Sequence, residues 1–127
     1  MSTILLIEND PDIRHLIAYK LGKGGLEVIE AADGLTGLHE ARRGPPDLII
    51  IGARLPHLSG LDICRELRAG PGTAAVPIIM LTARASPHDL EQAFAAGATD
   101  YLTMPLNPRE VQDRVESALQ RSGLQAN

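Results

Sequence analysis

Side chains that could take part in chemistry stand where the aliphatic runs of this sequence end. Glu8 and Asp10 follow the first run, and Thr82 ends a later one. Arg54 comes two residues after Gly52, which ends the most aliphatic run of the chain. Carboxylates can hold a divalent cation, while hydroxyl and guanidinium groups can bind an anion. Chemistry could be sited among these residues if the fold brings the ends of the runs together.

The stretch from Asp47 to Pro56 predicts the strand at the centre of the fold. Four aliphatic residues follow Asp47 without a polar break, and Gly52 comes where the run must end. A fully aliphatic run of this length is typical of a strand buried on both faces. Ligands of open α/β sheets bind beyond the carboxyl ends of such strands, so chemistry could be sited at Gly52.

The other elements predicted from the sequence alternate between strands and helices. Aliphatic runs predict strands at 3–7, 26–30, 76–81 and 101–103, and capping residues predict helices that begin after Asp10, Asp33, Ser59, Ser86 and Asn107. Parallel strands need right-handed helical crossovers, so this alternation predicts an α/β parallel sheet covered by helices on both faces. We expect a single domain over residues 1–127, with its core at about 3–121 and a frayed tail at 122–127.

Composition narrows the classes of function. The 127 residues are 44% hydrophobic and carry a net charge of -4, with acids and bases interspersed. This charge argues against nucleic-acid binding by the domain itself. One cysteine, Cys64, excludes an internal disulfide, and no segment resembles a leader or a membrane span. We therefore expect a soluble cytoplasmic domain without a membrane partner.

Several motifs, in order and in register, are similar to the receiver domain of bacterial two-component response regulators. They are Ile4-Leu5-Leu6-Ile7-Glu8-Asn9-Asp10-Pro11, Pro46-Asp47-Leu48, Leu55-Pro56, Ser59-Gly60, Met80-Leu81-Thr82-Ala83, Gly97-Ala98-Thr99-Asp100-Tyr101-Leu102 and Met104-Pro105. The resemblance covers almost the whole chain. It implies a flavodoxin-like (βα)5 doubly wound sheet in the order 2-1-3-4-5, a cis peptide bond before Pro105 and Tyr101 as the switch aromatic.

The resemblance also implies a phosphoryl-transfer site, from which this sequence departs. A receiver accepts a phosphoryl group on an Asp at the end of its third strand, and Gly52 stands at that position. Asn9 replaces one of the paired metal-binding acids, and Met104 replaces the Lys. Glycine has no side chain to phosphorylate, and a lysine without its counter-ion would be costly to bury. The resemblance therefore predicts a degenerate receiver. Its vestigial pocket comprises Glu8, Asn9, Asp10, Gly52, Thr82, Met104 and Pro105.

Four charged groups around this pocket allow more than one interpretation. Glu8 and Asp10 are weak candidates for binding Mg²⁺, and no tightly bound cofactor is expected. The resemblance places Arg54 and Arg84 at the rim of the pocket. Arg54 could fold back to neutralise Glu8 or Asp10, the two arginines could bind an anion, or both could be solvated surface residues.

Our first functional hypothesis is a signalling module that acts without phosphorylation, through a protein partner or a homodimer. The face that receivers usually use combines the fourth helix, the fifth strand and the fifth helix. The candidate interface residues are Phe94, Tyr101, Arg109, Glu110, Asp113 and Arg114. A sensor of a small anionic ligand is the alternative, followed by an unconventional phosphoreceiver that uses Asp10 or Asp47. We do not expect an enzyme, because no nucleophile and base are brought together.

Overall fold

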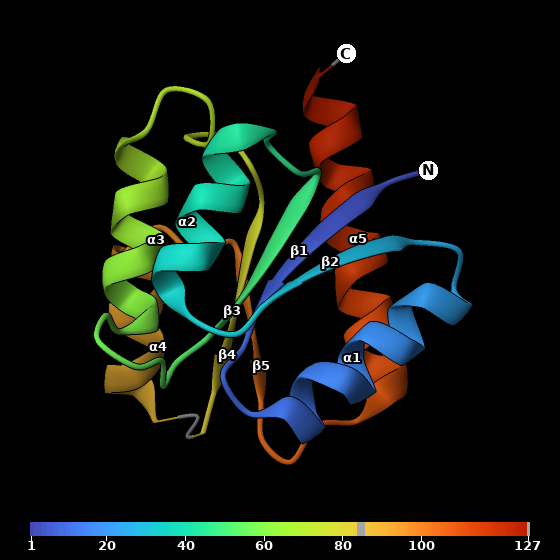
Figure 1. The fold of residues 1–127 in the computed structure, drawn as a ribbon, viewed down its shortest axis with the longest axis horizontal. Coiled ribbons are helices and arrows are strands. Elements are labelled where there is room, and N and C mark those ends of the chain that lie inside the picture. Colours follow the sequence, from blue (N-terminus) through green and yellow to red (C-terminus); the bar gives the residue numbers. More distant parts are fainter. Residues whose placement is uncertain (84–85, 127) are drawn as a thin grey trace.

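Strands and helices alternate throughout the computed structural model, which describes residues 1–83 and 86–126, with side chains as far as Gly123 (Figure 1). The strands are β1 (Thr3–Ile7), β2 (Glu27–Ala31), β3 (Leu48–Gly52), β4 (Ile78–Thr82) and β5 (Asp100–Thr103). The helices are α1 (Pro11–Lys23), α2 (Gly34–Arg43), α3 (Gly60–Ala69), α4 (Pro87–Ala95) and α5 (Pro108–Ala126). This order confirms the predicted α/β class.

The strands form one parallel sheet in the order β2-β1-β3-β4-β5. This order confirms the flavodoxin-like topology that the resemblance implied. Strand β3 lies in the middle, and each of its residues is buried, as its aliphatic sequence predicted. Ile7 of β1 lies opposite Ile51, and Gly52 lies opposite Leu81 of β4. The carboxyl ends of these three strands therefore meet at one edge of the sheet.

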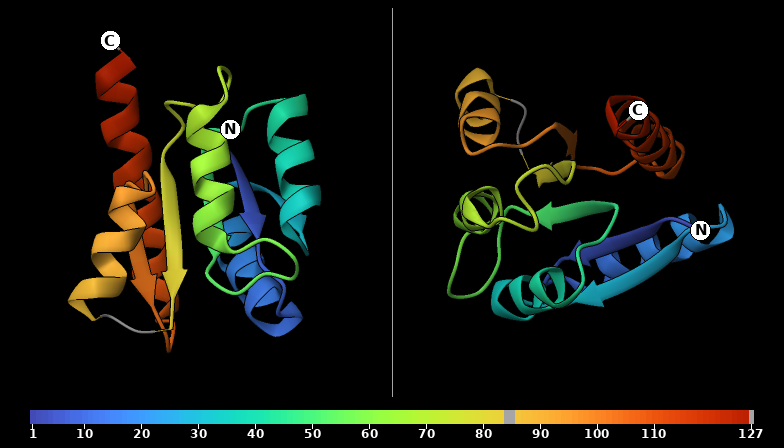
Figure 2. Two further views of the ribbon diagram at one scale, coloured as in Figure 1. Left: turned by 90° about the vertical axis from the view of Figure 1, so that its left-hand side faces the viewer. Right: turned by 90° about the horizontal axis from the view of Figure 1, so that it is seen from above.

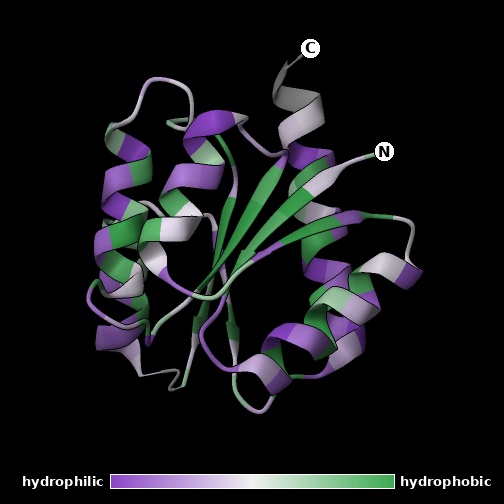
Figure 3. Cartoon of the chain, viewed as in Figure 1, coloured by the Kyte–Doolittle hydropathy of each residue, from purple (hydrophilic) through white to green (hydrophobic). Residues whose placement is uncertain are grey.

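Helices cover both faces of the sheet, so the domain has two hydrophobic cores. Helices α2, α3 and α4 lie on one face, while α1 and α5 lie on the other (Figure 2). Successive strand residues point to opposite faces, so Leu5 and Ile7 pack toward α2 and α3, whereas Ile4 and Leu6 pack toward α1 and α5. Figure 3 shows the hydrophobic strands between these two layers.

The helices begin at the positions that their capping residues predicted. Asp10, Asp33, Ser59 and Ser86 each accept a hydrogen bond from a backbone N–H in the first turn of their helix. Asn107 does the same for the N–H of Arg109 at 3.0 Å. Such caps satisfy backbone donors that have no partner within the helix.

Strands β2, β4 and β5 begin or end one or two residues from their predicted boundaries, and the start of β4 differs most. Strand β4 begins at Ile78 instead of Val76, because Pro77 has no N–H and the Val76 carbonyl accepts from Arg68 Nη1 at 2.6 Å. Helix α5 continues to Ala126 and so includes most of the tail at 122–127, whose fraying stays a prediction. None of the helices among the described residues combines the length and the apolar composition of a membrane-spanning segment.

Candidate functional site

The predicted pocket residues gather at the edge where β1, β3 and β4 end. Glu8, Asn9 and Asp10 follow β1, Thr82 ends β4, and Met104 follows β5. All five line one cavity of about 310 Å³, which we call the acid-side cavity. Its full lining is Glu8, Asn9, Asp10, Ile13, Ala53, Arg54, Leu81, Thr82, Ala83 and Met104. The sheet topology thus brings together residues that are far apart in the sequence, from Glu8 to Met104.

Glu8 fills the space that a side chain at position 52 would need. A Cβ atom placed on Gly52 would lie 2.5 Å from Glu8 Oε1 and 3.1 Å from Glu8 Cδ. These separations are shorter than van der Waals contact, so a larger residue at 52 would displace the Glu8 carboxylate. Glu8 is only 7% exposed. The lack of a side chain at Gly52 is therefore what allows this buried position of Glu8.

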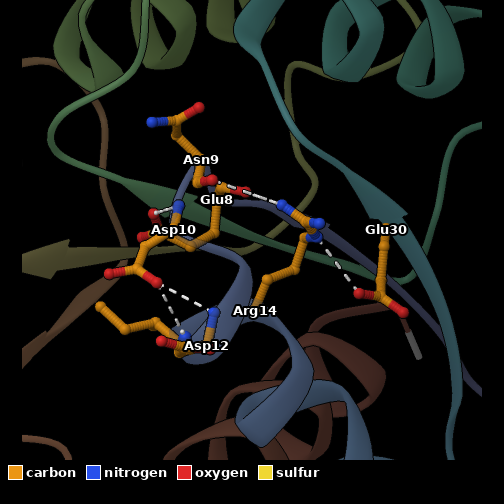
Figure 4. A network of polar contacts seen from close by, with 7 residues as sticks. Glu8, Asn9, Asp10, Asp12, Arg14 and Glu30 are labelled. Carbon is orange, nitrogen blue, oxygen red and sulfur yellow. Dashed lines mark hydrogen bonds and ion pairs between the residues drawn. The ribbon is translucent and has the colours of Figure 1, made fainter.

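Among the described residues, backbone groups of Asp10 and Asn9 donate hydrogen bonds to the buried Glu8 carboxylate. Its Oε2 accepts from the Asp10 N–H at 2.8 Å. Burial raises the pKa of Glu8 above its ordinary value, the hydrogen bond from Asp10 lowers the pKa by less, and the charge of Asp10 raises it. Arg14 lies between the Glu8–Asn9 turn and β2, where it donates to the Glu8 carbonyl at 2.9 Å and pairs with Glu30 at 3.3 Å (Figure 4). The Arg14 side chain thus holds the Glu8–Asn9 turn by binding the backbone carbonyl of Glu8.

Replacing Glu8 with Gln is expected to raise the free energy of unfolding near neutral pH by about 1 kcal/mol, because Gln removes a buried charge and can still accept from Asp10. The folded state binds the Glu8 proton more tightly than the unfolded state. The stability contributed by Glu8 is therefore present below its unfolded pKa and falls as pH rises through the folded pKa. The gain from Gln should appear at about pH 8 and vanish at about pH 4 in urea titrations.

An exposed residue provides the control for this measurement. Glu91 lies on α4 and is exposed, so Glu91→Gln should change stability little at either pH. A Glu8→Gln variant that is no more stable than the parent near neutral pH would show that the carboxylate is not penalised by burial.

The acids of the pocket do not form the Mg²⁺ site that the resemblance implies. Asp10 Oδ1 caps α1 by accepting from Asp12 N at 2.9 Å and from Ile13 N at 3.4 Å. Glu8 Oε2 is also held by a backbone N–H. Within residues 1–83 and 86–126, no group of three or more His, Cys, Asp or Glu side chains could hold a metal ion. Without a third such side chain in the described residues, Glu8 and Asp10 supply few of the oxygen ligands that Mg²⁺ takes, so the fit to a Mg²⁺ site is poor.

Thr82 and Met104 form the opposite wall of the cavity. Thr82 is 7% exposed, and its Oγ1 has no hydrogen-bond partner among the described residues. The Met104 N–H donates to the Thr82 carbonyl at 2.9 Å, and the Met104–Pro105 peptide bond is cis, as the resemblance implied. A buried hydroxyl without a partner is uncommon, which makes Thr82 a candidate contact for a ligand.

Arg54 lies at the rim but does not neutralise the acids. It is exposed, and in the described part of the chain it makes no ion pair or hydrogen bond with Glu8 or Asp10. The hypothesis that Arg54 replaces a cation by folding back onto the acids is therefore wrong. Arg84, the other predicted rim residue, lies outside the described residues.

Arg54 also borders a second cavity that the sequence did not predict. This α4-side cavity has a volume of about 410 Å³ and lies between α3, β4 and α4. Its lining residues are Ala53, Arg54, Ser59, Leu61, Met80, Thr82, Ala83, Asp89, Gln92 and Ala93. Arg54, Thr82, Ala53 and Ala83 line both cavities, so the two adjoin. No sequence motif marks Asp89 and Gln92 as site residues, because their nearness depends on where α4 packs.

The predicted interface residues lie on α4, β5 and α5. Phe94 is 47% exposed, and its ring meets Tyr101 edge-on, with 5.9 Å between centroids and 83° between planes. Arg114 lies 5.9 Å from the Tyr101 ring and binds both Asp100 oxygens, at 2.8 and 3.0 Å. The hydrogen bond to Asp100 raises the pKa of Arg114, and Glu110 adds an ion pair at 3.6 Å. Arg109 and Asp113 are exposed on the first turns of α5.

Similarity to known proteins agrees with this fold. The response regulator receiver domain model matches residues 4–116. The alkaline phosphatase synthesis transcriptional regulatory protein PhoP of Bacillus subtilis is 39% identical over 97% of this chain and 50% of its own length. This chain thus spans about half the length of the curated relatives it matches.

Solved structures extend the similarity to three dimensions. A putative response regulator from Chloroflexus aurantiacus has a TM-score of 0.90 at 34% identity, covering 94% of this chain and 98% of that one. The receiver domain of sensor histidine kinase PA1611 from Pseudomonas aeruginosa, with a magnesium ion in its active site cleft, has a TM-score of 0.87 at 36% identity with the same coverage. The chain belongs to the response regulator receiver domain family.

Proposed function

We propose that this chain is a receiver domain that takes up no phosphoryl group at the usual site and signals through phosphorylation-independent protein contacts. The observation that carries the proposal is the end of β3. Gly52 offers no carboxylate, and the Glu8 carboxylate fills the space where a side chain would be. A phosphoryl group has neither a nucleophile nor room at that position.

The charges around Gly52 support the same conclusion. An incoming phosphoryl group would meet the negative charges of Glu8 and Asp10, which line the cavity. Met104 gives no positive charge, and the acids do not fit a Mg²⁺ site, although the PA1611 receiver holds magnesium in its cleft. Phosphoryl transfer depends on cations that offset the charge of the transferred group. We infer that Mg²⁺ has no specific role in this domain and that the domain is not an enzyme.

The α4-β5-α5 face is the proposed contact surface. Phe94 exposes an aromatic ring next to Tyr101, and the Asp100–Arg114 ion pair holds the other side of that tyrosine. Aromatic and arginine side chains are enriched at protein interfaces. The same patch on two copies could meet around a two-fold axis, so a homodimer fits this face as well as a different protein partner does.

An unconventional phosphoreceiver has less support. Asp47 precedes β3, at the opposite end from the cavity, where its Oδ2 accepts from the Thr3 N–H at 2.7 Å. Asp10 caps α1, so its Oδ1 is already used by backbone donors. Each carboxylate has a structural task away from Gly52.

We expect the chain to show no phosphoryl adduct after incubation with acetyl phosphate and Mg²⁺, because the acceptor carboxylate is lacking. Intact-protein mass spectrometry measures this directly, and a receiver that carries the third-strand Asp serves as the positive control. A stoichiometric adduct would contradict the proposal. Peptide mapping of such an adduct to Asp10 or Asp47 would instead support the unconventional phosphoreceiver.

Ligand sensing is the second candidate function, because two adjoining cavities lie at the edge of the sheet. They have volumes of about 310 and 410 Å³, within the range of small-molecule sites. Thr82 lines both cavities, and its hydroxyl has no partner within the described chain. A ligand bound there would lie next to the first turns of α4, which belongs to the proposed contact surface.

A further inference from the structure

Two buried side chains of the acid-side cavity, Glu8 and Thr82, could contact a ligand. The Glu8 carboxylate accepts hydrogen bonds from the backbone of Asp10 and Asn9, and it carries the negative charge inside the cavity. Thr82 Oγ1 has no partner in the described chain. Both residues are 7% exposed. An unsatisfied buried hydroxyl is costly, so a ligand that met Thr82 Oγ1 and paired its own positive charge with Glu8 would gain binding energy.

The rest of the cavity has an apolar wall and a basic rim. Ile13, Leu81 and Met104 line the wall. Arg54 stands at the junction with the α4-side cavity and makes no ion pair with a described residue. The cavity therefore presents a carboxylate inside, a guanidinium at the rim and an apolar surface beside them.

We propose that the acid-side cavity binds a free α-amino acid with an apolar side chain. The ammonium group contacts Glu8 Oε1, the carboxylate binds Arg54, and Thr82 Oγ1 completes the polar contacts. The side chain packs on Ile13, Leu81 and Met104. This inference deepens the second candidate function and rests on the proposed loss of phosphoryl transfer, because the neutral Met104 contributes no positive charge to the cavity.

Charge and volume distinguish this ligand class from others. A purely anionic ligand would be repelled by Glu8 and Asp10, so the structure favours a zwitterion over the anion that the sequence suggested. A simple cation would have no negative group with which Arg54 could pair. A cavity of about 310 Å³ lies at the small end of ligand sites, which suits an amino acid better than a nucleotide.

The test begins with thermal shift on the full chain against L-alanine, L-valine, L-leucine and L-methionine, followed by calorimetry. At least one of these four amino acids should raise the melting temperature of the chain. For L-leucine, we expect L-leucinamide, which lacks the carboxylate, and 4-methylpentanoate, which lacks the ammonium, to bind about tenfold more weakly. No shift with any of the four amino acids would overturn the proposal. Equal affinity for L-leucinamide would also overturn it, because a peptide amino terminus would then fit equally well.

Matched variants locate the binding groups. Glu8→Gln, Arg54→Ala and Met104→Lys should each lower affinity by about tenfold, the last because a lysine would pair with Glu8 in place of the ligand. Thr82→Val should weaken binding, whereas Thr82→Ser keeps the hydroxyl and should preserve it. Arg43→Ala is the control, since Arg43 ends α2 and pairs with Glu40. Unchanged affinity in both Glu8→Gln and Arg54→Ala would refute the assignment.

Mass spectrometry of the same samples separates the two proposals. A phosphoryl adduct together with amino-acid binding would refute the loss of phosphoryl transfer and keep the ligand site. No adduct and no binding would refute the ligand site alone.

Discussion

The triple variant Asn9→Asp, Gly52→Asp, Met104→Lys is expected to take one phosphoryl group from acetyl phosphate in Mg²⁺ buffer, where the parent chain takes none. The three changes supply an acceptor carboxylate, a second acid and a cation at one edge of the sheet. The surrounding backbone matches that of a putative response regulator with a TM-score of 0.90, so the frame for these groups is present. Intact mass after a time course measures the change, which should run from no adduct to near stoichiometry.

Two controls show which atoms matter in the triple variant. With Gly52→Asn in place of Gly52→Asp, the variant keeps the shape but loses the nucleophile, so no adduct should form. Gly52→Asp alone should also fail, because no lysine at 104 then offsets the negative charge that it adds beside Glu8, whose Oε1 lies 2.5 Å from the new Cβ. An adduct in the Gly52→Asn control would mean that another residue accepts the group. A triple variant that folds but stays unmodified would show that the pocket geometry no longer suits the reaction.

Gly60→Ala is expected to lower the free energy of unfolding by about 2–4 kcal/mol. A Cβ atom at position 60 would overlap the Gly52 carbonyl oxygen, lie 3.0 Å from Met80 Cε and lie 3.2 Å from Ala53 Cα. Two of these contacts are to backbone, which cannot move as a side-chain tip can. Urea denaturation followed by far-UV circular dichroism measures the loss.

Gly22→Ala is the matched control for this substitution. Gly22 is exposed on α1, and nothing lies within 4 Å of a Cβ placed there. Alanine in a helix should leave stability unchanged or raise it by up to about 1 kcal/mol. If Gly60→Ala were as stable as Gly22→Ala, the backbone of Gly60 would not pack as closely against Gly52 and Ala53 as it does in the structure.

Most of the fold follows from local sequence signals. The aliphatic run before Gly52 predicted the buried central strand, and single capping residues such as Asp10 and Ser86 predicted where helices begin. Strand order came from resemblance, because periodicity does not reveal which strands are neighbours. The start of β4 depends on Arg68, whose guanidinium also donates to the Gly97 carbonyl at 2.8 Å, and a contact over this distance in sequence leaves no local signal.

The site could be predicted by position but not by conformation. Motif register placed Gly52, Thr82 and Met104 near one another, and the structure lines one cavity with Thr82 and Met104. The rotamer of Glu8 over Gly52 and the lack of an ion pair at Arg54 depend on tertiary packing. The Asp100–Arg114 pair escaped prediction for the same reason, since its partners come from different elements.

The position of Glu8 over Gly52 constrains the order in which mutations could restore a phosphorylation site. An aspartate at 52 that came first would place its side chain against Glu8, with no positive charge introduced nearby. A lysine at 104 that came first would give Glu8 a counter-charge and make the later aspartate tolerable. Of these two single substitutions, Met104→Lys is therefore the one that the structure tolerates first. A lineage that drifted to glycine and methionine together would not return by changing the glycine alone.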